Sequence, residues 1–212
     1  MDRTSREGRG RTNMGMPRRQ FFKHVGVTFA AIAVASANPF SQASAFAAAA
    51  LQGLKDVDIA NFALTLEHLE AEFYKLAVSG GQLTGDALKI LTAIRDHEIA
   101  HVGALTGVVK QLGGTPVAAL AKYNFGDMGS QASILKTAET LEMVGVGAYT
   151  GAAALIADKK AILPAAASIE QVESRHYAAI RYLNGADGAP EALGPKMTVD
   201  EVLAAVKPIL GN

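Results

Sequence analysis

Two short segments of the sequence each carry a glutamate and a histidine at a spacing that suits metal binding. RDHEIAH holds Glu98 and His101, three residues apart. QVESRHY holds Glu173 and His176 at the same spacing. Side chains three residues apart lie on the same face of an α-helix. Each pair can therefore present a carboxylate oxygen and an imidazole nitrogen together, and iron, manganese and zinc accept both donor types in proteins.

The two segments belong to an internal duplication in which residues match at an offset of 75. ALTLE and AETLE correspond at this offset, and each ends in a glutamate 31 residues before the glutamate of the next Glu-x-x-His segment. Chance predicts only about a quarter of one Glu-x-x-His in this composition, so two copies with matched partners indicate a repeat. The matched pairs are Glu67 and Glu142, Tyr74 and Tyr149, Glu98 and Glu173, and His101 and His176.

The chain around these residues has the hydrophobic period of helices. Between residues 87 and 112, apolar positions and the Glu98–His101 pair recur in alternating steps of four and three, which is the pattern of one face of a bundle helix. Two tight turns and a longer link at residues 113–129 predict an all-α four-helix bundle with one crossover, made of two duplicated helical hairpins. The expected helices span about residues 56–79, 85–112, 130–157 and 164–184, and a shorter C-terminal helix in TVDEVLAAVKPIL packs on the outside.

The composition agrees with a helical domain and excludes several chemistries. Half of the 212 residues are apolar, Ala is very common, and there is no Cys. Ala and Leu are strong helix formers, and the lack of Cys rules out disulfides and thiolate metal sites. After residue 47, 18 Asp and Glu stand against 13 Lys and Arg. Because no basic stripe follows the chain, nucleic acid is not an expected partner.

The six Glu and His residues lie on the apolar faces of their expected helices, so four carboxylates meet away from water. Burying one unpaired carboxylate costs on the order of several kcal/mol, and neighbouring like charges raise that cost. Lys and Arg are absent from the same positions, which leaves protonation, a buried polar network or bound metal. Two divalent ions balance four carboxylates, and two neutral imidazoles complete the ligand set. Such a site suits iron or manganese, with zinc left open.

A glutamate on two helices and Glu-x-x-His on the other two resembles the di-metal carboxylate site of ferritin-like bundles. The resemblance covers about residues 56–185. Together with the N-terminal leader, the LEHLEAEFY opening is similar to the exported ferritin-like family that includes desiccation-related proteins. The resemblance implies two metal ions with Glu98 and Glu173 as bridging carboxylates. The implied metal ligands are Glu67, Glu98, His101, Glu142, Glu173 and His176.

Several residues near the implied ligands are expected to lie beside the metals. The resemblance implies that Tyr74 and Tyr149 hydrogen-bond to carboxylates across the bundle, and the alternative is two amphipathic core tyrosines. Glu70 lies one turn after the first ligand, but its partner in the repeat is Gly145. We therefore expect Glu70 at a rim that reaches solvent or on the path of incoming iron, the alternatives being a seventh ligand or no role. His97 lies off the apolar face and is expected at the surface.

The N-terminal leader has the order of an export signal. PRRQFFK is basic, VGVTFAAIAVA is apolar, and SQASAFA offers cleavage after Ala45 or Ala47. The paired Arg18 and Arg19, followed by Phe and Lys, resemble the twin-arginine signal, which implies the twin-arginine export machinery as a partner. We expect a periplasmic or extracellular protein without membrane attachment after cleavage, and the alternative is an uncleaved anchor. The predicted division is a signal peptide at residues 1–47 and a bundle domain at residues 48–212.

Three functions are compatible with this pattern. The first is a redox enzyme that oxidises ferrous iron, reduces peroxide or dismutates peroxide with manganese, so that O₂ or peroxide is a partner. The second is a non-enzymatic metal-binding protein that protects against stress such as desiccation. The third is a buried polar network without metal, in which Glu98→Ala would change stability and leave metal content unchanged. A homo-oligomer is compatible with each of them.

Overall fold

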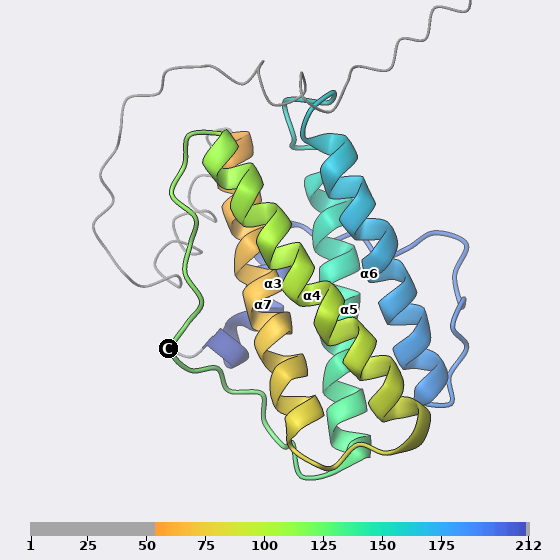
Figure 1. The fold of residues 1–212 in the computed structure, drawn as a ribbon. Helices are drawn as coiled ribbons and strands as arrows, with labels where there is room; N and C mark the ends of the chain where they lie inside the picture. Colours follow the sequence, from red (N-terminus) through yellow and green to blue (C-terminus); the bar gives the residue numbers. More distant parts are fainter. Residues whose placement is uncertain (1–53, 211–212) are drawn as a thin grey trace, which may run out of the picture.

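Residues 54–210 are described by the computed structural model, and the regular structure in this range is helical throughout. Four long helices stand side by side as a bundle, and a short fifth helix lies against its outside (Figure 1). The predicted all-α fold with a short C-terminal helix is thereby confirmed. The helices are α3 (Asp56–Ser79), α4 (Gly85–Gln111), α5 (Gln131–Ala152), α6 (Leu163–Leu183) and α7 (Val199–Leu210).

The predicted leader and its boundary at residue 47 lie outside the described residues. Within the described range, the helices are too short or too polar for any of them to cross a lipid bilayer.

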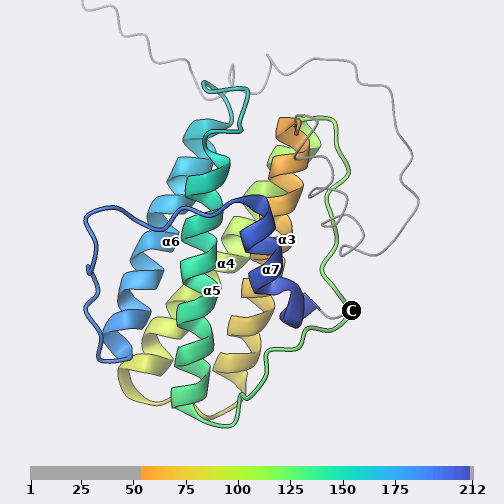
Figure 2. The same ribbon diagram turned by 180° about the vertical axis from the view of Figure 1, so that it is seen from behind.

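Each half of the bundle is a helical hairpin. α3 packs along α4 and α5 packs along α6, and contacts of α3 with α5 and of α4 with α6 join the two hairpins (Figures 1 and 2). Every long helix buries apolar side chains on both sides of its acidic residues, as Leu64 and Phe73 do on α3 and Ile169 and Ile180 do on α6. The polar residues therefore lie midway along the bundle, between two apolar regions.

The link between the hairpins runs back along the bundle beside α3 (Figure 1). Asn61 holds it there, because its side-chain amide donates to the carbonyl oxygen of Thr115 at 3.1 Å and accepts from the backbone amide of Val117 at 2.9 Å. His68 Nε2 lies 3.1 Å from the Val117 carbonyl oxygen. The link is thus fixed to the first helix by side chains, although it has no regular structure of its own.

Two glycines of α5 let the segment before α7 lie directly on that helix. The Met197 amide donates to the carbonyl oxygen of Gly147 at 2.9 Å, and a Cβ at Gly151 would stand 1.8 Å from the Met197 carbonyl oxygen. This close approach brings α7 to the outside of the bundle, where Val202 and Val206 are buried against the core (Figure 2). The C-terminal helix therefore packs where the sequence predicts.

The end of α5 differs from the sequence prediction. The helix stops at Ala152, five residues before the predicted end, and a turn leads into α6. The backbone amides of Ala157 and Asp158 donate to the carboxylate of Asp56 at 2.7 and 2.8 Å. These bonds tie the turn to the start of α3, so the two amides are satisfied by a side chain instead of a longer helix.

Candidate metal centre

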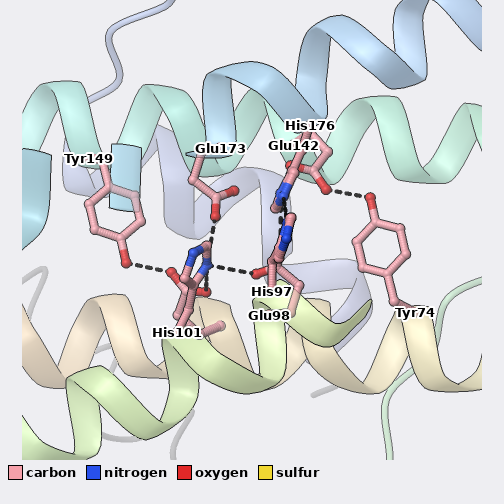
Figure 3. A network of polar contacts seen from close by, with 9 residues as sticks. Tyr74, His97, Glu98, His101, Glu142, Tyr149, Glu173 and His176 are labelled. Carbon is pink, nitrogen blue, oxygen red and sulfur yellow. Dashed lines mark hydrogen bonds and ion pairs between the residues drawn. The ribbon is translucent and has the colours of Figure 1, made fainter. Parts of the chain in front are cut away.

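The six residues predicted as ligands are buried in the same part of the bundle interior, and Figure 3 labels five of them there. Their four glutamates are 0 % exposed, and the two histidines are 7 % and 4 % exposed. Each long helix contributes at least one of these side chains from the buried face that packs against the other helices. The contributions are Glu67 from α3, Glu98 and His101 from α4, Glu142 from α5, and Glu173 and His176 from α6.

One group of donors surrounds His101. Its Nδ1 lies 3.2 Å from oxygens of both Glu67 and Glu98. The same nitrogen is 3.1 Å from an oxygen of Glu173. One donor atom from each of these four residues lies within 4.8 Å of the others, so a single ion can be held by all of them. We call this group the His101 position.

A second group surrounds His176. Its Nδ1 lies 2.9 Å from Glu98 Oε1 and 3.5 Å from Glu142 Oε2. These three residues also place donor atoms within 4.8 Å of one another, and we call this group the His176 position. Glu98 belongs to both positions because its other oxygen, Oε2, faces His101. The ring centroids of His101 and His176 are 6.1 Å apart, so the two positions are immediate neighbours.

Glu70 is not at a solvent-reaching rim, and that expectation is wrong. It is 3 % exposed and forms a third donor group with Glu142 and Glu173. The space it needs is provided by Gly145, where a Cβ would stand 3.2 Å from Glu70 Oε1 and 3.0 Å from Glu173 Oε2. The glycine that the duplication places opposite Glu70 therefore makes room for the carboxylate of Glu70 itself.

The two tyrosines cross between the hairpins (Figure 3). Tyr74 of α3 donates its hydroxyl hydrogen to Glu142 of α5, and Tyr149 of α5 donates in return to Glu67 of α3. All four side chains are buried. Each tyrosine thus contacts the carboxylate of the opposite half, which is the arrangement that a duplicated hairpin related by an approximate two-fold axis produces.

His97 is a member of the polar network that the sequence interpretation missed. It is exposed, as expected, but its Nδ1 lies 2.9 Å from His176 Nε2. The two rings stack with centroids 5.2 Å apart and planes at 9°. A sequence signal was present, because His97 lies one helical turn before His101 and residues four apart lie on neighbouring parts of one helix face.

Burial dominates the protonation of the carboxylates. It raises the pKa of Glu67 from 4.5 to about 8, and it raises the pKa of Glu70 and of Glu173 well above 4.5, with neighbouring carboxylates adding to the effect. Burial acts in the same direction on Glu98, but close contacts with the two histidines outweigh it and lower the pKa of Glu98 to about 2. The carboxylate shared by the two positions is therefore the one held most firmly in its charged form.

The histidines respond in the opposite way to the same surroundings. Burial alone lowers the pKa of an imidazole. Close contacts with the surrounding carboxylates outweigh burial and raise the pKa of His101 to about 12 and that of His176 to about 10. At neutral pH and without cations, the centre therefore retains protons on both rings and on the carboxyl group of Glu67. Metal binding to such a site releases these protons.

Several buried atoms of the centre form no hydrogen bond of regular geometry, even where a histidine nitrogen and a carboxylate oxygen lie close together, and they allow the donor set to be tested against a metal. They include one oxygen each of Glu98 and Glu142, both oxygens of Glu173, and Nδ1 of His176. The Lys and Arg ion pairs found among residues 54–210 involve other carboxylates. Buried groups without partners are costly. Divalent cations would satisfy these oxygens and this nitrogen at once, so the residues fit the metal ions that the fold implies.

A comparison with known protein families agrees with this fold and centre. A family model described as a ferritin-like domain matches residues 55–186. The chain belongs to the ferritin-like domain family. The match spans all four long helices and every residue of the three donor groups. No curated protein sequence matches the chain significantly. As a ferritin-like protein, the chain thus carries buried Glu and His groups that can hold metal ions.

Proposed function

We propose that this ferritin-like protein binds two iron or manganese ions in its buried centre and uses them to oxidise ferrous iron or to consume peroxide. The observation that carries the proposal is the position of Glu98. Its two oxygens lie 3.2 and 2.9 Å from the inward nitrogens of two different histidines. A buried carboxylate shared in this way suits two neighbouring ions. Oxygen-rich ligands with one imidazole per ion favour iron or manganese. Elemental analysis of the bound metal would distinguish these two metals from zinc.

The residues of the chain would hold the ions and limit side reactions. Tyr74 and Tyr149 fix Glu142 and Glu67 by donating hydrogen bonds to them. Apolar clusters flank the centre along the bundle and keep bulk water away. Two adjacent ions of iron or manganese, when bound, supply paired electron exchange with a small oxidant.

A small apolar cavity beside the His101 position supports the proposal that the substrate is a small molecule. Its volume is about 40 Å³, and its walls come from all four long helices, with Leu66, Leu105 and Tyr149 among them. The hydroxyl of Tyr149 donates to Glu67, so the cavity adjoins the centre. A cavity needs only about 10–15 Å³ of volume of this kind to hold one water. The cavity therefore has room for a molecule of the size of O₂ or hydrogen peroxide.

Metal loading of the full chain tests the proposal. After loading with Fe²⁺ or Mn²⁺ without oxygen, we expect two ions per chain by elemental analysis and consumption of O₂ or peroxide after mixing. Glu67→Gln and Glu142→Gln should each lose one ion. Glu72→Gln is the matched control, because Glu72 lies on the helix of Glu67 with its side chain 40 % exposed and pairs with Lys75, and it should retain both. A chain that binds neither metal would contradict the proposal.

A protective, non-enzymatic function is the second candidate. The observation that favours it is that ligands come from all four long helices, so bound ions would cross-link the whole bundle. Binding to the folded state alone stabilises a protein in proportion to ligand affinity. A protein that binds two ions and gains thermal stability, yet consumes neither O₂ nor peroxide, would support this candidate over the redox enzyme.

We also propose that the protein acts in the periplasm or outside the cell. The support is the leader sequence, in which Arg18 and Arg19 precede an apolar segment. Replacing both arginines by lysine should abolish export, whereas mass spectrometry of the exported wild-type protein should show a new N-terminus after Ala45 or Ala47. Export of the double-lysine variant at the normal level would contradict the twin-arginine route.

A further inference from the structure

The apolar cavity beside the His101 position lies one helical turn from the predicted ligands of that position. Ala63 of its lining lies four residues before Glu67 on α3. Leu105 of its lining lies four residues after His101 on α4. Tyr149 also lines the cavity and donates its hydroxyl hydrogen to Glu67 (Figure 3). A molecule in the cavity would therefore lie against a side chain that is bonded directly to the centre.

The duplication shows why there is space at this place. Four residues that line the cavity are alanines, and their partners at the offset of 75 are bulky. The bulky partners pack in the apolar cluster that contains Tyr74. A bulky residue that is replaced by alanine leaves a cavity unless the surroundings close in. The pairs are Leu135 and Ala60, Phe73 and Ala148, Ile90 and Ala165, and Leu91 and Ala166, and we call the four alanines the cavity alanines.

Three residues of the lining are larger than their partners, and two of these lie at the end of the bundle. Ile156 and Ile162 correspond to Gly81 and Ala87. Both isoleucines belong to the turn between α5 and α6, and they are 2 % and 8 % exposed. The third is Phe62, within α3. The cavity alanines thus leave space in the interior, and the two isoleucines lie between that space and the end of the bundle.

The chemistry of the lining distinguishes between small oxidants. Among the residues that line the cavity, Tyr149 alone has a polar side-chain group, and its hydrogen is donated to Glu67. Hydrogen peroxide would lose hydrogen bonds with water on entering, and a polar molecule buried without such bonds is unfavourable. Dioxygen is apolar and gains by leaving water. The lining therefore favours dioxygen over peroxide.

We propose that this cavity is a docking site for dioxygen, from which dioxygen reaches the centre on the side of the His101 position, and that peroxide does not use it. The cavity alanines determine this specificity, because they leave the space and keep it apolar. The inference rests on the proposed oxidation of ferrous iron. It narrows that proposal by naming dioxygen as the oxidant and by assigning its approach to one side of the centre.

Nuclear magnetic resonance of the metal-free full chain tests whether dioxygen enters. Dissolved dioxygen is paramagnetic, so it speeds the relaxation of methyl protons close to it. We expect the methyl groups of Leu66 and Leu105, which line the cavity, to relax at least threefold faster under dioxygen than those of Leu91. Leu91 is the matched control, because it is fully buried and is the partner of Ala166 on the Tyr74 side. Equal relaxation of all three leucines overturns the docking site.

Filling the cavity tests the cavity alanines. Ala60→Leu and Ala166→Leu copy the residues of the Tyr74 side, and each should abolish the faster relaxation in the metal-free chain. After loading with Fe²⁺, each should lower the rate of oxidation by dioxygen at least tenfold. The number of bound ions should stay at the wild-type value, and the rate of oxidation by peroxide should change less than threefold.

Ala167→Leu is the matched control for these variants. Ala167 follows Ala166 on α6, is exposed, and does not line the cavity, so all measured values should stay as in the wild type. Circular dichroism checks that the variants are helical. Ala60→Val adds less bulk than leucine and should give a partial loss of the faster relaxation, which keeps the test valid if Ala60→Leu does not fold.

The outcomes separate this inference from the proposed function. A loaded wild-type protein that consumes neither dioxygen nor peroxide overturns the proposed redox function, whereas faster relaxation of Leu66 and Leu105 in the metal-free chain would still support the docking site. Filled variants that consume dioxygen at the wild-type rate overturn the inference and leave the proposed function intact. Equal slowing of the reactions with dioxygen and with peroxide also overturns the inference, because the cavity would then not distinguish the two oxidants.

Discussion

The hydroxyl of Tyr74 satisfies a buried carboxylate that belongs to another helix. Tyr74→Phe removes the only hydrogen that this side chain donates to Glu142 and leaves the buried oxygen unpaired. We expect the free energy of unfolding of the metal-free protein to fall by about 1–3 kcal/mol, measured by urea denaturation. Tyr182→Phe is the control, because Tyr182 is 75 % exposed and should change stability by less than about 0.5 kcal/mol. Equal effects of the two substitutions would show that the bond to Glu142 contributes nothing.

At the residue scale, the duplication predicts more than any single motif does. Glu67 and Glu142 carry no local signature, and only their common offset from the Glu-x-x-His segments singles them out. The same reasoning fails for Glu70, because its repeat partner is a glycine. The burial of Glu70 depends on α5 facing α3 at Gly145, and that contact between hairpins is not encoded in the spacing of residues along one helix.

The contact between His97 and His176 could not be predicted from the sequence for a related reason. Its place on α4 is at the edge of the apolar face, where a histidine is equally compatible with solvent. Whether it meets His176 is decided by how closely α6 packs against α4, and the 2.9 Å distance between His97 Nδ1 and His176 Nε2 follows from that packing.

At the element scale, α5 and the segment before α7 are in direct backbone contact at Gly151. Gly151→Ala would place a methyl group 1.8 Å from the Met197 carbonyl oxygen, so the segment and α7 must move away from the helix. We expect a loss of about 1–3 kcal/mol in the free energy of unfolding and faster proteolysis within residues 188–210. Urea denaturation and limited proteolysis with mass spectrometry measure these two effects.

Gly103→Ala provides the matched control for that prediction. Gly103 lies within α4, is exposed, and has no atoms within 4 Å of an added Cβ. Because alanine favours the helix by up to about 1 kcal/mol over glycine, this variant should be slightly more stable than the wild type. A Gly151→Ala protein as stable as Gly103→Ala would contradict the close approach of the segment to α5.

Helices are predictable here from hydrophobic period, but their ends depend on distant contacts. α3 begins and ends where the period predicts, with Gly80 and Gly81 following it. α5 ends early because the amides of the next turn bond to Asp56, about 100 residues away in the sequence. No local pattern around Ala152 predicts these two hydrogen bonds, so the sequence prediction extends the helix too far.

At the scale of the whole molecule, protons and cations compete for the same buried donors. The folded-state pKa is about 8 for Glu67 against 4.5 in an ordinary carboxyl, and about 10 for His176 against 6.5 in an ordinary imidazole. A group with a raised folded pKa stabilises the fold fully below its unfolded pKa and loses that contribution as pH rises through the folded value. Glu98, with its pKa lowered to about 2, acts oppositely, but only below about pH 4.5.

The metal-free protein should therefore lose stability as pH rises from about 5 to about 10, first through the carboxylates and then through the histidines. Bound ions replace the protons, and metal affinity rises with pH because the ligands must be deprotonated. We expect the increase in melting temperature caused by a fixed excess of Mn²⁺ to be larger at pH 8 than at pH 6, measured by scanning calorimetry of the full chain. Glu67→Gln with Glu142→Gln, which lacks two of the carboxylates, should show a smaller pH dependence with and without Mn²⁺. An increase that is equal at both pH values would mean that the buried carboxylates and imidazoles are not the groups that cations neutralise.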